Sequence, residues 1–143
     1  MLSSGPAGFA RCAVRRALAV LAAGALGSGA IAGCSNSADT AQIGVRPWGS
    51  YDVAVELRPA PPRPGHNEVV VIITGEHHRP VYDALVSLRA DSSQAWVQAI
   101  EDGHVGVYRR AVLFGAGTQA TLQVRLQRAD VQSVLEFPVA MVP

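Results

Sequence analysis

The chain has 143 residues, of which 49% are hydrophobic and 16% are charged, so the composition excludes a disordered protein. Its formal net charge is only +1, with 12 basic residues that are all arginine. Three of them, Arg11, Arg15 and Arg16, lie near the N-terminus, and the rest of the chain has nine arginines against eleven acidic residues. We therefore expect no nucleic-acid partner, because such a partner requires a clustered basic face.

The N-terminal region has the pattern of a secretory signal. The arginines of "RCAVRR" precede an uncharged apolar run from Ala17 to Ala32. This run is rich in Gly and Ala and is short for a membrane-spanning helix, which needs about 20 strongly apolar residues. The run ends in Ile31, Ala32, Gly33 and Cys34, which together resemble a bacterial lipobox. In that motif, small residues precede the cleavage site and the cysteine sulfur receives the lipid.

This resemblance predicts that Cys34 carries a lipid anchor and that residues 1–33 are removed as a lipoprotein signal peptide. An ordinary signal followed by a chance cysteine is the alternative. Cys12 would leave with the signal, so no thiol would remain for a disulfide, a metal or a catalytic nucleophile. Acyl chains on Cys34 would hold the protein stably at the membrane, facing the periplasm. Ser35, where an aspartate would resemble an inner-membrane retention signal, favours the outer membrane over the inner.

Residues 34–49 are predicted to be the lipidated cysteine and a flexible tether. They include "SNSADTAQIGVRPWG", which is small and polar and has no hydrophobic period. Residues 50–143 are predicted to form the folded domain, because short alternating hydrophobic runs begin there.

The first half of this domain contains three predicted strands. "YDVAVELR" places Val53, Val55 and Leu57 on one face, and "EVVVIIT" at 68–74 is a nearly continuous run typical of a strand buried on both faces. The proline-rich segment at 59–67 separates them. A turn or loop at 75–80 precedes a third strand, in which Ala84, Val86 and Leu88 face inward.

The second half continues the alternation. Trp96, Ala99 and Ile100 have helical spacing, but Asp102-Gly103 between two apolar runs is a strong hairpin signal, so we predict strand, turn, strand. "TLQVRLQ" at 121–127 alternates perfectly. "VLEFPVAMV" at 134–142 supplies the last strand, with Pro138 implying an edge position or a bulge.

About seven short strands with breaks every 8–12 residues predict an all-β fold, namely an immunoglobulin-like antiparallel β-sandwich. A small closed barrel is the alternative. Residues 51–139 resemble the YtkA-like/FixH-like family of small Ig-like bacterial domains. The resemblance rests on Pro80, Val81, Ala84 and Val86, and on a later Gly106-x-Tyr108.

That family is associated with copper handling and oxidase assembly, but the sequence departs from its pattern. Asp91-Ser92-Ser93-Gln94 stands where a Met-Pro segment is common, and Gly117-Thr118-Gln119 stands where Gly-x-Trp is common. Met141 is the single methionine of the predicted mature chain, which excludes a site built from several thioethers.

Histidines supply the metal-like cluster of the sequence. His77 and His78 lie beside Glu76, and they can bind copper or zinc if His66 or His104 joins them from a neighbouring loop. A polar loop without metal is the simpler interpretation, because no typical ligand spacing is present. We therefore expect no cofactor, with copper or zinc as the alternative.

Other residue pairs have structural interpretations beside functional ones. Glu101 and Asp102 can act as paired carboxylates, but turn chemistry explains them equally. Trp96 is expected in the core, with a ligand platform formed with Trp48 as the alternative. Arg109 and Arg110 can meet an acidic partner or a phosphate, but we favour a surface and sheet-edge position. Nothing resembles a nucleophile elbow.

These patterns predict a lipid-anchored, periplasm-facing binding or assembly module that is not an enzyme. Its function would lie in the loops at 59–67, 75–80 and 102–104, and its partner would be a protein of the cell envelope met by strand-edge or loop contacts. The alternative is a metal-binding or metal-delivery protein that uses the loop histidines.

Overall fold

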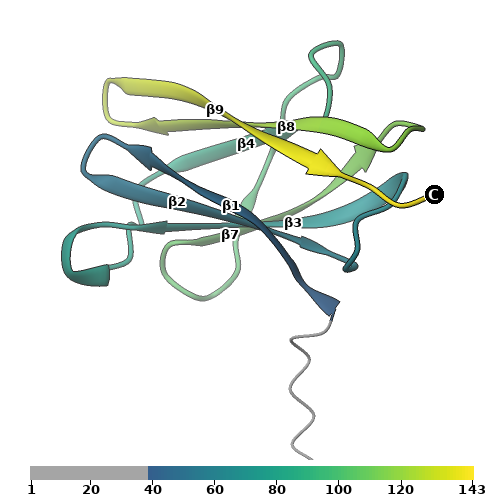
Figure 1. Cartoon of the computed structure of the whole chain (residues 1–143). Coiled ribbons are helices and arrows are strands. Elements are labelled where there is room, and N and C mark those ends of the chain that lie inside the picture. The colour runs from purple at the N-terminus through teal and green to yellow at the C-terminus, as the bar shows by residue number, and fades with distance from the viewer. Residues whose placement is uncertain (1–38) are drawn as a thin grey trace, which may run out of the picture. The chain divides into compact units, whose positions relative to one another are not determined.

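A computed structural model describes residues 39–143 of the chain. These residues form two antiparallel sheets packed face to face, so the predicted all-β sandwich is confirmed and a closed barrel is not formed (Figure 1). One sheet, which we call sheet A, has five strands in the order β1 (Ala41–Trp48), β2 (Tyr51–Arg58), β3 (Gly65–Thr74), β7 (Val107–Phe114) and β6 (Ile100–Glu101). Sheet B has four, in the order β5 (Val97–Gln98), β4 (Leu85–Arg89), β8 (Gln119–Arg128) and β9 (Val131–Ala140).

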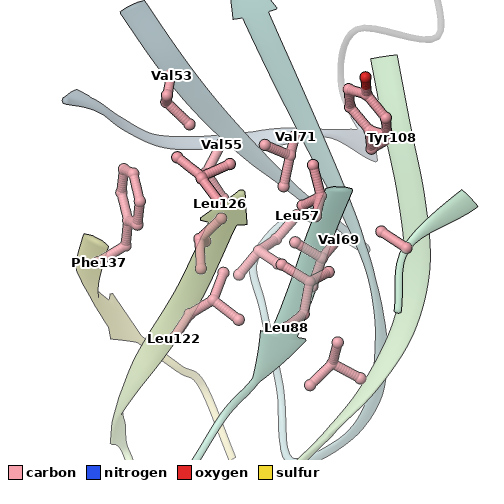
Figure 2. Close-up of a cluster of buried hydrophobic side chains, with 14 of the residues drawn as sticks. Val53, Val55, Leu57, Val69, Val71, Leu88, Tyr108, Leu122, Leu126 and Phe137 are labelled. Carbon is pink, nitrogen blue, oxygen red and sulfur yellow. The ribbon is translucent and has the colours of Figure 1, made fainter. Parts of the chain in front are cut away.

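The core lies between the sheets and consists of the inward-facing residues of the alternating runs. Val53, Val55 and Leu57 of β2 are fully buried, as predicted. They face Leu122, Leu126 and other apolar side chains of sheet B across the core (Figure 2). Alternation with period two therefore fixes which face of each strand turns inward.

Strand β1 corrects the prediction of a tether that extends to residue 49. Ala41–Trp48 pair with β2 along the edge of sheet A, with an irregularity between Gln42 and Gly44. The strand has no clean alternation because at the edge position its residues are exposed or half-buried, and only Trp48 among them is buried. Pro47 is tolerated there because an edge strand has one side without a ladder partner.

Strand β3 is buried on both faces at its centre, as predicted, although among residues 39–143 a second sheet covers only one of these faces. Val69, Val71 and Ile73 enter the core, whereas Val70 lies outside the core cluster and is nevertheless only 2% exposed. It is flanked in the sheet by Glu56 of β2 and Arg109 of β7, whose long side chains can cover it.

The hairpin predicted around Asp102-Gly103 is present between β6 and β7. The apolar run before it is split, however, because β5 pairs with β4 in sheet B and β6 pairs with β7 in sheet A. Ala99, which lies between them, is buried and donates its N–H to the carbonyl of Val86 at 2.9 Å. The chain therefore crosses from one sheet to the other at this residue.

Candidate functional site

Four connections meet at one end of the sandwich, which we call the loop end. They are the β1–β2 turn at 49–50, the β3–β4 loop at 75–84, the β6–β7 loop at 102–106 and the β8–β9 turn at 129–130. The strand registers place them together, and Figure 1 shows them on the same side. The predicted loops at 75–80 and 102–104 are therefore neighbours, whereas the proline-rich loop at 59–64 lies at the opposite end of β3.

Arg128, the last residue of β8, contacts both the β3–β4 loop and the first residue of β2. Its Nε lies 2.5 Å from Oδ1 of Asp83, and its Nη1 donates a hydrogen bond to the hydroxyl of Tyr51. The hydrogen bond and charge of this guanidinium lower the pKa of the Asp83 carboxyl. The guanidinium also lies 5.2 Å from the centroid of the Tyr51 ring, which in turn lies 5.5 Å from the Trp48 ring. The loop end is therefore organised around one arginine.

Two hollows flank Arg128 and share it with Tyr51 and Asp83. One, of about 510 Å³, is walled by Trp48, Val131 and Ser133. The other, of about 490 Å³, lies against His77, Arg79 and Tyr82. Tyr82 is 72% exposed, so a large aromatic side chain projects from this end into solvent. Both hollows are of a size that can receive a side chain or small ligand.

The tip of the β3–β4 loop has an unusual backbone. His77 and His78 both have left-handed conformations, with φ of 55° and 57°. Each costs roughly 1–2 kcal/mol for a residue other than glycine. The turn is closed beneath them by the N–H of Gly75, which donates to the carbonyl of Arg79 at 2.7 Å. Strain of this kind, held in place by the surrounding structure, is typical of functional loops.

The four predicted metal-site histidines do not lie together. His77, His78 and His104 are exposed at the loop end, but His66 lies near the start of β3, at the opposite end of the sandwich. Among residues 39–143, no three His, Cys, Asp or Glu side chains are grouped to hold a metal ion.

Glu101 and Asp102 have partners within the loop end rather than each other. Oδ2 of Asp102 lies 2.8 Å from Nε of Arg109, and Oε1 of Glu101 accepts the N–H of Gly106 at 3.4 Å. Gly106 needs its left-handed φ of 78° and its lack of a side chain, because a Cβ there would lie 2.8 Å from the carbonyl of Ile73. The N–H of Ile73 donates to the carbonyl of Gly106 at 2.9 Å, which joins the β6–β7 loop to the end of β3.

The prediction that Trp96 lies in the core is wrong. The side chain is half-buried beside the outer face of sheet B, where the guanidinium carbons of Arg89 and Arg125 lie 4.3 and 4.6 Å from its ring centroid. The ring thus gains cation–π contacts in place of core packing. Trp48, by contrast, belongs to the core cluster.

Sequence reasoning did not single out Tyr51, Asp83, Tyr82 or Arg128. Arg128 is separated from Tyr51 by 77 positions and from Asp83 by 45 positions, so no local sequence motif indicates the cluster. The predicted lipidation residue Cys34 and its neighbours Ile31, Ala32 and Gly33 lie outside the described residues.

Comparisons with family models, curated proteins and solved structures return no match for this chain. The resemblance to YtkA-like and FixH-like domains therefore stays a prediction. The structure defines the protein as an antiparallel β-sandwich. No helix within residues 39–143 is long and apolar enough to cross a membrane.

Proposed function

We propose that this protein is a lipid-anchored, periplasm-facing binding or assembly module of the bacterial envelope that has no catalytic role. The basic segment, the apolar run and the sequence Ile31-Ala32-Gly33-Cys34 support the anchor. Ser35 after the cysteine supports the outer membrane as its location.

The direction of β1 supports the loop end as the contact surface. Ala41 pairs with Leu57, near the proline-rich loop, whereas Trp48 pairs with Tyr51 at the loop end. An eight-residue strand spans roughly 25 Å, so the loop end lies that far from the point where β1 begins. A chain anchored through Cys34 would therefore present its loop end away from the membrane. The direction of β1 is the observation that carries the proposal.

The side chains at the loop end also suit protein recognition. Tyr82 is an exposed aromatic residue, and Tyr and Arg side chains are enriched in protein interfaces. Arg128 donates a hydrogen bond to Asp83 at 2.5 Å, and Arg109 forms an ion pair with Asp102, so two arginines of this surface are held in place before contact. The partner in this proposal is another envelope protein.

Binding or delivery of copper or zinc is the alternative function. It is supported by the exposed positions of His77, His78 and His104 on adjoining loops. His66 belongs to a different end of the sandwich and would not join them. The β3–β4 loop would have to move to bring these imidazoles together around a metal ion.

The anchor is tested by growing cells with a clickable palmitate analogue and fractionating their membranes. The full-length chain should be labelled and membrane-bound, and Cys34→Ala should lose both properties. Cys12→Ala is the matched control and should retain both. Labelling that survives Cys34→Ala would refute the lipid anchor.

The contact surface is tested by placing a photo-crosslinking amino acid at position 82 in living cells. A discrete crosslinked envelope protein is expected from this position. The control position is Val134, which is 45% exposed on β9 of sheet B. Identical crosslinks from both positions, or none from position 82, would remove the loop end from the proposal.

The metal alternative is tested by titrating the purified chain with Cu(I), Cu(II) and Zn(II). Tight one-to-one binding that is lost in the His77→Ala/His78→Ala double variant, and kept in His66→Ala, would establish it. Weak binding that is the same in all three proteins would exclude it.

A further inference from the structure

Strand β7 has an edge that is only partly covered. On one side it pairs with β3 from Val107 to Phe114. On the other side β6 pairs only with Tyr108 and Arg109. From Arg110 onward, no strand among the described residues pairs with this edge.

The direction of the backbone groups on this edge follows from three hydrogen bonds. The N–H of Val107 donates to the carbonyl of His104 at 3.0 Å, and the Val107 carbonyl accepts the N–H of Asp102 at 3.0 Å. The carbonyl of Leu113 accepts Nε2 of Gln94 at 3.1 Å. Val107 and Leu113 thus direct their backbone groups away from β3.

Antiparallel strands alternate between residues that bond to one neighbour and residues that bond to the other. Ala111, which lies between these two positions, must therefore also direct its N–H and C=O away from β3. Ala111 is exposed, and its outward groups have no partner in the part of the chain that the structure describes. The edge thus offers Ala111 and the N–H of Leu113 for further pairing.

The side chains along the edge define what it can receive. Leu113 is 51% exposed, so an apolar side chain lies beside the open backbone groups. Arg110 is exposed and forms no ion pair with residues 39–143. Arg109, by contrast, is occupied by Glu68 and Asp102. Arg110 and Leu113 therefore give this edge one positive charge without an ion pair to residues 39–143 and one exposed apolar side chain.

We propose that an extended, acidic segment of a partner protein adds to this edge as a strand and continues the line begun by β6. Its backbone pairs with Ala111 and Leu113, an acidic side chain meets Arg110, and an apolar side chain packs on Leu113. Strand addition of this kind takes its affinity from main-chain hydrogen bonds and its specificity from alternate side chains. The segment displaces the Gln94 amide from the Leu113 carbonyl. This site is separate from the loop end and does not depend on it.

Proline at position 111 provides a selective test. Proline lacks the N–H that the incoming strand would use, and it is tolerated on an edge strand where that N–H faces solvent. Ala111→Pro should therefore keep the β3–β7 ladder and lose the docking site. Ala111→Val keeps the N–H and is the matched control. Arg110→Glu reverses the charge without touching the backbone and covers the case in which Ala111→Pro does not fold.

The experiment uses the full-length chain in uncharged detergent micelles and two fluorescein-labelled heptapeptides, one of alternating Glu and Val and one of alternating Lys and Val. Fluorescence anisotropy should show saturable binding of the acidic peptide. Affinity should fall about tenfold or more in Ala111→Pro and Arg110→Glu and stay unchanged in Ala111→Val. Hydrogen exchange at the amides of Ala111 and Leu113 should slow when the peptide is bound.

Failure of the acidic peptide to bind, equal binding of the lysine peptide, or equal affinity for a folded Ala111→Pro variant would each overturn the proposal. None of these outcomes bears on the crosslinking result at position 82, so the two proposals fail separately.

Discussion

Arg128 and Asp83 form an ion pair of 2.5 Å that links the end of β8 to the loop before β4. The same arginine donates to the hydroxyl of Tyr51 in β2, so one side chain connects both sheets at the loop end. The geometry of the two hollows therefore depends on this residue.

The Arg128–Asp83 ion pair should make the stability of the protein depend on pH under acidic conditions. Because the arginine lowers the pKa of Asp83 in the folded protein, the stabilisation from this pair is present above the ordinary aspartate pKa of 3.8. It is lost as the pH falls through the lowered folded value. We expect the difference in unfolding free energy between the native chain and Asp83→Asn to shrink between about pH 5 and pH 2. Urea unfolding at several pH values measures it, and Arg128→Gln should remove the same dependence. A constant difference would contradict the assignment.

Tyr108 should contribute to a loss of folding stability at alkaline pH. Its hydroxyl donates to the carbonyl of Val81 at 3.3 Å, and burial raises its pKa above 10.0. The raised value favours the neutral form, so its stabilisation is full below pH 10.0 and is lost as the pH rises beyond it. Tyr108→Phe should lower the free energy of unfolding by about 0.5–1.5 kcal/mol near neutral pH. The variant should also lose less stability at alkaline pH than the native chain. Thermal unfolding at pH 7 and above pH 10 checks both, and an identical alkaline loss in the variant would refute the role of Tyr108.

Substitution by alanine should lower the stability by different amounts at two glycines of the β6–β7 loop. Gly103 has a φ of 66° and open space around its missing Cβ, so Gly103→Ala should cost about 1–2 kcal/mol of backbone strain. Gly106→Ala should cost more, because the new Cβ would meet the Ile73 carbonyl at 2.8 Å and the Val81 nitrogen at 3.0 Å. Denaturant midpoints of the two variants give the comparison. Equal losses would show that the close contacts are relieved without cost.

Trp96 should be energetically coupled to the arginine beside it. A double-mutant cycle with Trp96→Leu and Arg125→Gln is expected to give a coupling of about 0.5–1 kcal/mol. The cycle subtracts the other contacts of each side chain, such as the 3.4 Å hydrogen bond from Arg125 to Ser87. A coupling of zero would mean that the tryptophan is only packed against the strand.

Strands could be predicted where apolar inward-facing residues alternate regularly with outward-facing residues. Val53, Val55 and Leu57 of β2 and Leu122, Val124 and Leu126 of β8 are buried as the alternation requires. The edge position predicted from Pro138 is also confirmed, since β9 ends sheet B.

Other features could not be predicted from local patterns. The pattern of β1 is obscured because few of its residues are buried. Trp96 is drawn out of the core by two arginines that come from other strands. The Arg128 cluster depends on sheet order, which brings together residues that a single sequence gives no reason to pair.

The direction of β1 also has a mechanical consequence. It runs antiparallel to β2 from the end where Ala41 pairs with Leu57 to the loop end. A pulling force between the N-terminal side of the domain and a partner held at the loop end would act along the strand. The hydrogen bonds between β1 and β2 would then be loaded together in shear instead of opening one after another. The domain is therefore arranged to carry tension between its two ends.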